Sequence, residues 1–192
     1  MDYKIVLGIT ATVLAFFSYI PYFRDIWQGK TKPHAFSWLV WGTLTAIAFA
    51  GQVADKGGAG AWVTGFTAVV CLLIFAAAVW RGEKRITTSD WLSLLGAAVA
   101  LGLWGLTKSP LLSVILITLI DAFGFFPTFR KSYFKPHSET LITYVISSFK
   151  FVLALIALDN FTVVTSLYPI SLVLMNGAFA VMLVIRRQHV KA

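Results

Sequence analysis

Apolar segments of about twenty residues recur along the whole chain, and short polar breaks separate them. Of the 192 residues, 58% are hydrophobic and 12% are charged, whereas globular domains carry about 45–50% apolar and about 25% charged residues. A helix of about 20 apolar residues spans the hydrocarbon core of a bilayer. We therefore expect an all-α membrane protein with seven transmembrane helices, near residues 4–23, 35–53, 60–80, 90–107, 110–129, 138–158 and 161–185.

Positive charges are concentrated on one side of this arrangement. That side carries twelve Lys and Arg residues: Arg24, Lys30, Lys32, Arg81, Lys84, Arg85, Arg130, Lys131, Lys135, Arg186, Arg187 and Lys191. The other side carries Lys4, Lys56 and Lys108, while Lys150 falls within a span. Because cytoplasmic loops hold the excess of Lys and Arg, we expect an outside N-terminus and a cytoplasmic C-terminus, in the cytoplasmic membrane of a bacterium. The net charge of +8 then reflects topology and contact with membrane lipids, and we expect no nucleic-acid partner.

Two parts of the chain resemble each other. The segment from Pro21 to Arg24 aligns with the segment from Pro127 to Arg130, and Arg81 aligns with Arg186 at the exits of the third and seventh spans. Each unit then contains three helices, and an odd helix between them lets the units lie parallel in the membrane. We expect a first three-helix repeat with its cytoplasmic loop at 1–86, a linker helix at 87–109, and a second repeat with a cytoplasmic tail at 110–192, a 3+1+3 parallel repeat.

Both repeats place a proline near the end of their first helix. Proline removes a backbone donor and kinks a helix, and in a bilayer the freed carbonyl needs a partner from a neighbouring helix or a water-filled cavity. Pro21 and Pro127 are therefore predicted hinges of a path that alternates in access. The alternative is that each proline only ends its helix.

These motifs resemble the PQ-loop pattern of the SWEET and SemiSWEET sugar transporters. The resemblance rests on Pro21 and Arg24, on Lys30-Thr31-Lys32, on Ser37, and on the run Trp38-Leu39-Val40-Trp41. The motif is degenerate, since Tyr22 and Thr128 replace the glutamine that follows each proline. The resemblance implies the SWEET fold and a transport function. Nicotinamide riboside transporters share that fold and a W-x-x-W motif, which Trp38 and Trp41 also match.

The resemblance further implies a substrate-binding asparagine in the third helix of a repeat, and Asn176 matches it. The aligned position in the first repeat is Cys71, whose alternative role is a small buried filler. The alternative for Asn176 is a hydrogen bond between helices. Polar groups inside a bilayer are costly unless they are satisfied, so each one suggests a function.

Aromatic side chains offer a flat apolar face on which a solute ring can stack. Trp41 and Tyr144 occupy matched positions and are the main stacking candidates. Trp38 is a further candidate, with an interfacial belt as its alternative role. Thr45 and Ser148 place a hydroxyl in each repeat, although such groups often bond back to their own helix.

Two ionisable residues lie deep in the spans of the second repeat. Asp121 and Lys150 should pair with each other or line a water-filled cavity, because an isolated charge at this depth is costly. One hypothesis is a structural ion pair; the other is that Asp121 binds and releases a proton and couples transport to a gradient.

The sequence thus predicts an alternating-access transporter of a small polar solute, either sugar-like or another small metabolite. The alternatives are a non-transporting ligand-binding or sorting receptor, a vitamin transporter of the nicotinamide riboside kind, and a lipid transporter. No nucleophile–base pair, phosphate loop or metal cluster stands out, so we expect neither an enzyme nor a cofactor or metal. The sequence leaves open whether the protein forms a homo-oligomer.

Overall fold

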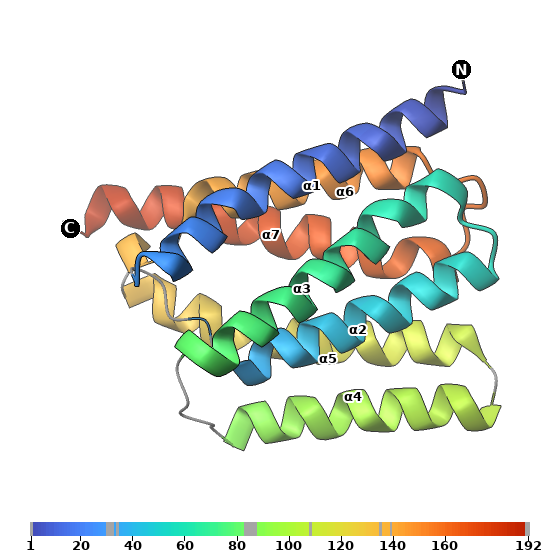
Figure 1. The fold of residues 1–192 in the computed structure, drawn as a ribbon, viewed down its shortest axis with the longest axis horizontal. Helices are drawn as coiled ribbons and strands as arrows, with labels where there is room; N and C mark the ends of the chain where they lie inside the picture. The colour runs from blue at the N-terminus through green and yellow to red at the C-terminus, as the bar shows by residue number, and fades with distance from the viewer. Residues whose placement is uncertain are drawn as a thin grey trace.

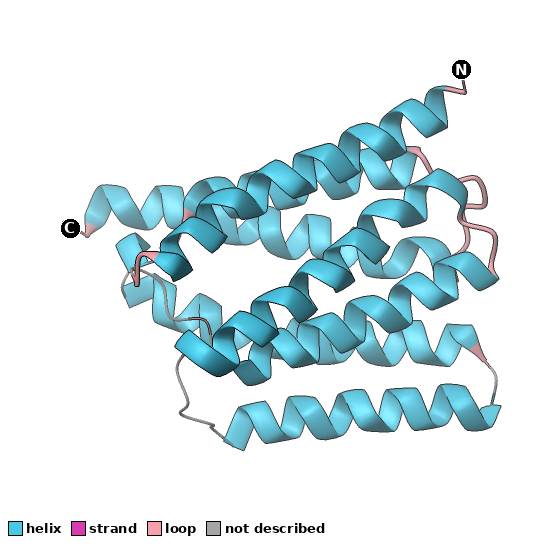
Figure 2. Cartoon of the chain, viewed as in Figure 1, coloured by secondary structure: helices cyan, strands magenta, loops and turns pink. Residues whose placement is uncertain are grey.

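The computed structural model describes residues 2–29, 33, 35–82, 88–107, 109–134, 136–138 and 140–190. Within these ranges the chain is helical, with short connections at both ends of the bundle (Figure 2). The α-helices are α1 (Tyr3–Trp27), α2 (Ala35–Ala54), α3 (Trp62–Arg81), α4 (Thr88–Thr107), α5 (Pro110–Phe134), α6 (Leu141–Ile156) and α7 (Val163–His189). Two 3₁₀ turns, η1 (Gly58–Ala61) and η2 (Pro136–Ser138), precede α3 and α6. The seven predicted helices are confirmed.

The helices have the length and composition of membrane spans. Among the described residues, four helical segments are long and apolar enough to cross a bilayer: Tyr3–Trp27, Ser37–Ala54, Gly58–Arg81 and Val163–His189. Two shorter apolar helical segments, Pro110–Ala122 and Leu141–Ile156, accompany them. Large apolar side chains also cover the outside of the bundle; Phe17, Leu73 and Leu174 are each more than half exposed. An apolar exterior around a buried core is what a lipid solvent requires, so the chain is a multi-pass integral membrane protein.

The helices pack in two groups with the same internal order. In the first group α3 packs against both α1 and α2, and in the second α7 packs against both α5 and α6. The groups meet where α1 packs on α6 and where α2 packs on α5. Helix α4 packs on α5 and α2 and forms the edge of the bundle opposite α1 (Figure 1).

The two ends of the bundle carry different connections. The chain begins at one end, beside the α2–α3 and α6–α7 connections, and we name this the N-terminal end (Figure 1). The last turns of α1, α3, α5 and α7 and the first turns of α2, α4 and α6 lie at the opposite, C-terminal end. Of the cations counted for orientation, Lys30, Lys32, Lys84, Arg85, Lys108, Lys135 and Lys191 lie outside the described residues.

Two helices run past their prolines. Helix α1 continues from Pro21 to Trp27, and α5 continues through position 127 to Phe134, four and five residues beyond the predicted ends at 23 and 129. The alternative in which each proline only ends its helix is therefore wrong. The hinge role of Pro21 and Pro127 stays a prediction.

The aligned arginines make matched contacts at the C-terminal end. The Arg81 side chain donates from Nη1 to the Trp27 carbonyl at 3.1 Å, and its guanidinium lies 4.7 Å from the centre of the Trp27 ring. Arg186 donates from Nε to the Tyr133 carbonyl at 2.9 Å and lies 4.0 Å from the Tyr133 ring. Each arginine thus ties the third helix of its group to the end of the first helix.

Candidate functional site

Buried polar side chains from six helices meet inside the bundle. We name this set the polar cluster: Tyr19 of α1, Thr45 of α2, Thr67 and Cys71 of α3, Asp121 of α5, Lys150 of α6 and Tyr168 of α7. Each is at most 8% exposed. The cluster therefore joins both helix groups and leaves out only α4.

Lys150 is the most constrained member of the polar cluster. Its side chain is 1% exposed, and its Nζ donates to the Tyr19 hydroxyl at 3.5 Å and to Thr67 Oγ1 at 3.4 Å. The ammonium also lies 4.8 Å from the Tyr19 ring centre and 5.1 Å from that of Phe151. Charge-assisted hydrogen bonds are normally about 2.7–2.9 Å long, so these oxygen contacts are weak, and ring faces supply part of the stabilisation.

The ion pair predicted between Asp121 and Lys150 is not formed. In the part of the chain that the structure describes, the pairs within 4.0 Å are Lys4 with Asp159 and Arg24 with Asp25. The reason is the packing order: α7 lies against both α5 and α6, and these two helices are not packed neighbours. Lys150 instead points toward the first group, where Tyr19 and Thr67 receive it.

Asp121 is buried without an adequate partner. Its side chain is 3% exposed, and the buried Oδ2 accepts no hydrogen bond. A buried oxygen in this condition costs about 1–3 kcal/mol, and more when it is charged. The carboxyl group interacts electrostatically with Cys71 and Tyr168.

Cys71, Thr45 and Tyr168 are the remaining buried members of the polar cluster. The Cys71 thiol is 3% exposed and interacts electrostatically with both Lys150 and Asp121. Thr45 bonds back to the Trp41 carbonyl, as the alternative for such residues anticipates, and its Oγ1 also lies 3.5 Å from the Tyr168 hydroxyl. Cys71 therefore belongs to the polar cluster.

Aromatic rings form a layer on the C-terminal side of the polar cluster. The aromatic layer consists of Tyr22, Trp38, Trp41, Phe125, Phe129, Tyr144 and Phe179, with neighbouring ring centres 4.4–6.4 Å apart. Tyr22, Trp41 and Phe125 each lie one helical turn from a cluster residue of the same helix. The layer crosses from the first helix group to the second where Trp41 meets Phe125 at 6.3 Å.

The predicted aromatic pair is joined through other rings. Trp41 packs on Phe125, Phe125 packs on Phe179, and Phe179 packs on Tyr144 at 4.4 Å. Trp38 lies between Tyr22 and Trp41, so it belongs to the same layer.

Asn176 and Ser148 make contacts outside the polar cluster. The Asn176 Nδ2 donates to the Leu172 carbonyl of its own helix at 2.7 Å, and the side chain is 6% exposed. Ser148 Oγ donates across helices to the Val173 carbonyl at 3.0 Å. Asn176 therefore uses its amide nitrogen within α7, and Ser148 joins α6 to α7.

A polar clamp joins the two helix groups at the N-terminal end. Its innermost contact involves Pro169, which lies inside α7 and cannot donate to the Thr165 carbonyl one turn earlier. Gln52 of α2 supplies the missing donor: its Nε2 bonds to the Thr165 carbonyl at 2.8 Å, and its side chain is 1% exposed. A side chain of one group thus supplies the hydrogen bond that a proline removes from a helix of the other.

The remaining clamp contacts link the α2–α3 connection to the α6–α7 connection. Thr162 Oγ1 donates to the Asp55 carboxylate, Asn160 Nδ2 donates to the Asp55 carbonyl at 3.0 Å, and the Asp159 amide donates to the Gly57 carbonyl at 3.1 Å. Gly58 has a φ of 62°, and a Cβ there would overlap the Asp159 carboxylate. From α1, Lys4 Nζ donates to the Leu158 carbonyl at 2.8 Å and pairs with Asp159 at 3.5 Å.

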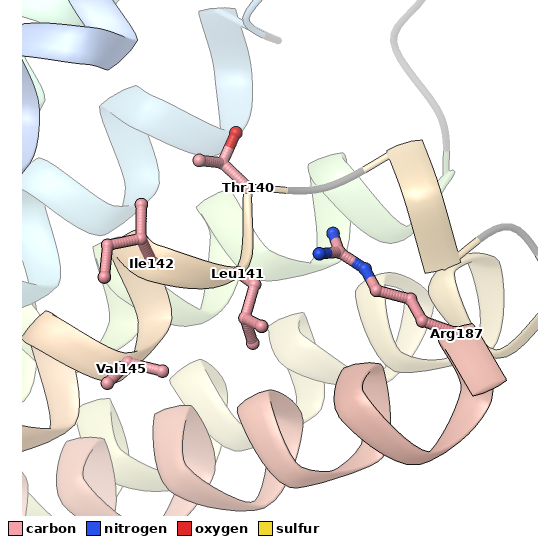
Figure 3. A pocket seen from close by; sticks show the side chains of 5 residues that line it. All are labelled: Thr140, Leu141, Ile142, Val145 and Arg187. Carbon is pink, nitrogen blue, oxygen red and sulfur yellow. The ribbon is translucent and has the colours of Figure 1, made fainter. Parts of the chain in front are cut away.

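A separate hollow of about 390 Å³ lies on the surface near the C-terminal end. It is lined by Thr140, Leu141, Ile142, Val145 and Arg187, and Figure 3 shows Arg187 approaching Leu141 from α7. Its lining contains none of the predicted site residues.

Sequence reasoning missed several of these residues. Tyr19, Thr67 and Tyr168 complete the polar cluster, and Gln52 completes the clamp. The mid-span position of Thr67 was an available signal, and the proline at position 169 marked a carbonyl at position 165 in need of a donor such as Gln52. Among the described residues, no group of three His, Cys, Asp or Glu side chains could hold a metal ion.

The fold and the site define a multi-pass membrane protein with a buried ionisable cluster between two helix groups. Neither the family models, nor the curated proteins, nor the solved structures compared with this chain give a match.

Proposed function

We propose that the protein is an alternating-access transporter of a small polar solute. In this proposal the units 1–86 and 110–192 rock against each other around the polar cluster, and residues 87–109 link them. The fold would be the 3+1+3 parallel repeat expected from the SWEET-like pattern, with the C-terminal end in the cytoplasm.

The packing order supports two equivalent units. Helix α3 lies against α1 and α2 as α7 lies against α5 and α6, and the contact of α1 with α6 mirrors that of α5 with α2. The matched contacts of Arg81 with Trp27 and of Arg186 with Tyr133 extend this equivalence to side chains.

Closure on both sides of the polar cluster supports alternating access. The clamp closes the N-terminal end with hydrogen bonds between the units, and the aromatic layer closes the side toward the C-terminal end. A transporter needs two closures that can open in turn, whereas a static structural core needs none.

The single observation that carries the proposal is that Asp121 and Lys150 are both buried and that neither has a full set of hydrogen-bond partners. Ionisable groups buried within membrane spans are rare and commonly mark solute or proton pathways. In this structure they lie between the two closures and do not pair.

Solute counterflow in proteoliposomes tests the proposal. Vesicles loaded with one unlabelled solute at a time, from a panel of sugars, amino acids and vitamins, should accumulate the labelled form of a transported solute faster than empty vesicles do. Binding without counterflow would instead favour the receptor, and movement of fluorescent phospholipid between leaflets would favour the lipid transporter. If Asn176→Ala leaves binding and counterflow intact, Asn176 is not part of the site.

Proton coupling through Asp121 is a separate part of the proposal. The unpartnered Oδ2 can accept a proton, and the titratable groups that interact electrostatically with Asp121 are Cys71 and Tyr168. Uptake should then respond to an imposed pH gradient, and Asp121→Asn should remove that response. If uptake by the unmodified protein does not depend on the pH gradient, proton coupling is excluded.

A further inference from the structure

The surface hollow near the C-terminal end is lined by two kinds of side chain. Leu141, Ile142 and Val145, from the first turns of α6, are apolar. Thr140, which precedes α6, and Arg187, from the last turn of α7, are polar. Arg187 lies on one side of the hollow, and Ile142 and Val145 lie on the other (Figure 3). The volume of about 390 Å³ is within the range of about 300–1,000 Å³ that is usual for ligand sites.

This division of the lining falls where two membrane helices change from apolar to polar. The apolar helix Leu141–Ile156 begins directly after Thr140, its N-cap residue. The apolar helix Val163–His189 carries Arg186, Arg187 and His189 in its last turn. Charged residues at the ends of membrane helices lie at the level of the lipid headgroups, and apolar residues lie at the level of the acyl chains. The hollow therefore spans both levels.

The outer face of α6 continues the apolar part of the hollow. Ile142, Val145, Phe149 and Ile156 are all exposed, and their spacing of three, four and seven residues places them on one face of the helix. From Ile142 to Ile156 this face is about 21 Å long, at 1.5 Å per residue. A hydrocarbon chain that enters the hollow can thus extend along α6 without leaving apolar surface.

Arg187 is held in place at the polar side of the hollow. Its Nε donates to the Pro136 carbonyl at 3.1 Å, which ties the end of α7 to the turn before α6. The side chain is half-buried, so its guanidinium is fixed beside the hollow and not dispersed in solvent. The planar guanidinium matches the geometry of phosphate oxygens and binds them with charge-assisted hydrogen bonds.

The sequence around the hollow has a surplus of positive charge. Segments 130–140 and 186–192 contain one acidic residue, Glu139, and six basic ones: Arg130, Lys131, Lys135, Arg186, Arg187 and Lys191. Of these, Lys135, Glu139 and Lys191 lie outside the described residues. Basic clusters at the end of membrane helices attract anionic lipids. The charge thus favours an anionic occupant over a neutral one.

We propose that the hollow binds an anionic glycerophospholipid, with its phosphate on Arg187 and one acyl chain against Leu141, Ile142 and Val145. A free phosphate would use the arginine but not the apolar lining, and a neutral lipid would use the lining but not the charge. A zwitterionic lipid would bring a second cation next to Arg187. Only the anionic lipid matches both parts of the hollow. The site is separate from the polar cluster and does not depend on the transport proposal.

Native mass spectrometry of the purified full chain in detergent tests the inference. The probes are phosphatidylglycerol and phosphatidylcholine with the same acyl chains, added in equal amounts. The protein should retain phosphatidylglycerol in preference to phosphatidylcholine, because only the former has a net negative charge. Glycerol phosphate, which has the anion without the chains, should not displace the retained lipid at the same concentration.

Two variants locate the lipid in the hollow. Arg187→Gln should lower the preference for phosphatidylglycerol roughly fivefold, the usual effect of one cation near a membrane surface. Arg24→Gln removes an exposed arginine near the same end of the bundle and should keep the preference.

The second variant, Val145→Trp, fills the apolar part of the hollow and leaves the charge unchanged. It should lower the retention of phosphatidylglycerol several-fold. Val79→Trp places the same side chain at an exposed position near the end of α3 and serves as its control.

The unmodified protein alone can overturn the inference, whether or not the variants fold. Equal retention of the two lipids would mean that the headgroup is not recognised, and displacement by glycerol phosphate would mean that the occupant is a free anion. A preference that survives both Arg187→Gln and Val145→Trp would place the retained lipid elsewhere on the protein. Loss of the preference in these two variants, with both controls unchanged, supports the lipid site.

Discussion

At the scale of single residues, the structure is governed by how buried polar groups find partners in a membrane. Pro169 removes a donor from α7, and Gln52 of the other helix group replaces it at the Thr165 carbonyl. Asp121 and Lys150, by contrast, do not have a full set of hydrogen-bond partners. Gln52 therefore stabilises the bundle, whereas Asp121 and Lys150 have unused hydrogen-bonding capacity.

The Gln52 bond leads to a prediction that links it to Pro169. Gln52→Leu leaves the Thr165 carbonyl without a donor and should destabilise the protein by about 1–3 kcal/mol, less whatever is gained by removing its own unpartnered Oε1. Pro169→Ala restores the backbone N–H that can bond to Thr165. The loss caused by Gln52→Leu should therefore be smaller when Pro169→Ala is also present, as thermal unfolding of the four proteins in detergent would measure.

Gln28→Leu is the matched control, since Gln28 is exposed at the end of α1. Its effect should be small and independent of Pro169→Ala. If the effects of Gln52→Leu and Pro169→Ala on stability simply add, Gln52 does not compensate for the backbone donor that Pro169 lacks.

At the scale of helices, the sequence predicted the number and order of the elements because span length and apolar composition are local properties. It ended α1 and α5 too early, because a membrane helix can continue past a proline when neighbours satisfy the freed carbonyl. The Asp121–Lys150 ion pair was wrong for a different reason. The depth of a residue along its helix can be counted from the sequence, but the sequence does not say which helix packs between two others.

The predicted polar and aromatic residues lie close to one another in two sets, but the sequence did not predict which other residues join them. Thr45, Cys71, Asp121 and Lys150 gather in one cluster, and Trp38, Trp41 and Tyr144 gather in one layer. The rings that join them, Phe125 and Phe179, carry no polar signal and were missed, because nothing in the sequence distinguishes them from other apolar residues of the spans.

The matched arginines give a prediction at this scale. Arg81→Lys and Arg186→Lys keep the positive charge but lose the planar guanidinium that bonds a carbonyl and covers a ring. Each should lower stability by about 0.5–1 kcal/mol, and the double variant should show the sum, because the contacts lie in different helix groups. Denaturation monitored by tryptophan fluorescence measures the effects.

Arg24→Lys is the comparison, since Arg24 is exposed and pairs with the adjacent Asp25. It should have a smaller effect than either matched substitution. A clear effect at Arg81 with none at Arg186 would argue against equivalent roles in the two groups.

At the scale of the whole molecule, the two ends are closed by different forces. Hydrogen bonds and an ion pair link the helix groups at the N-terminal end, whereas aromatic contact links them toward the C-terminal end. The matched arginine contacts at the C-terminal end hold each group together and do not link one group to the other. These arginine contacts would therefore stay intact if the groups moved apart as the transport proposal requires.

Cross-linking the clamp should stop alternating access. Asp55→Cys with Thr162→Cys places thiols where the two connections meet. A membrane-impermeant bifunctional thiol reagent should abolish counterflow of the transported solute, and reduction should restore it. The native Cys71 is buried and should escape the reagent. Each single-cysteine variant should keep its counterflow under the same treatment, and full counterflow in the cross-linked protein would contradict an opening of this end.

The unpaired charges also predict how the empty protein behaves. With no solute bound, this closed conformation holds a buried carboxylate oxygen without a donor and an ammonium with weak contacts, whereas either open conformation lets water satisfy them. One unsatisfied buried group costs about 1–3 kcal/mol, which corresponds to a roughly 5- to 160-fold slower passage through the closed state. A bound solute that pairs with these groups removes that cost. Exchange of labelled for unlabelled solute should therefore be faster than net efflux into solute-free buffer by a factor of this order, in the same proteoliposomes. Equal rates would mean that the empty protein closes as readily as the loaded one, and the unpaired charges would then have no part in limiting the return step.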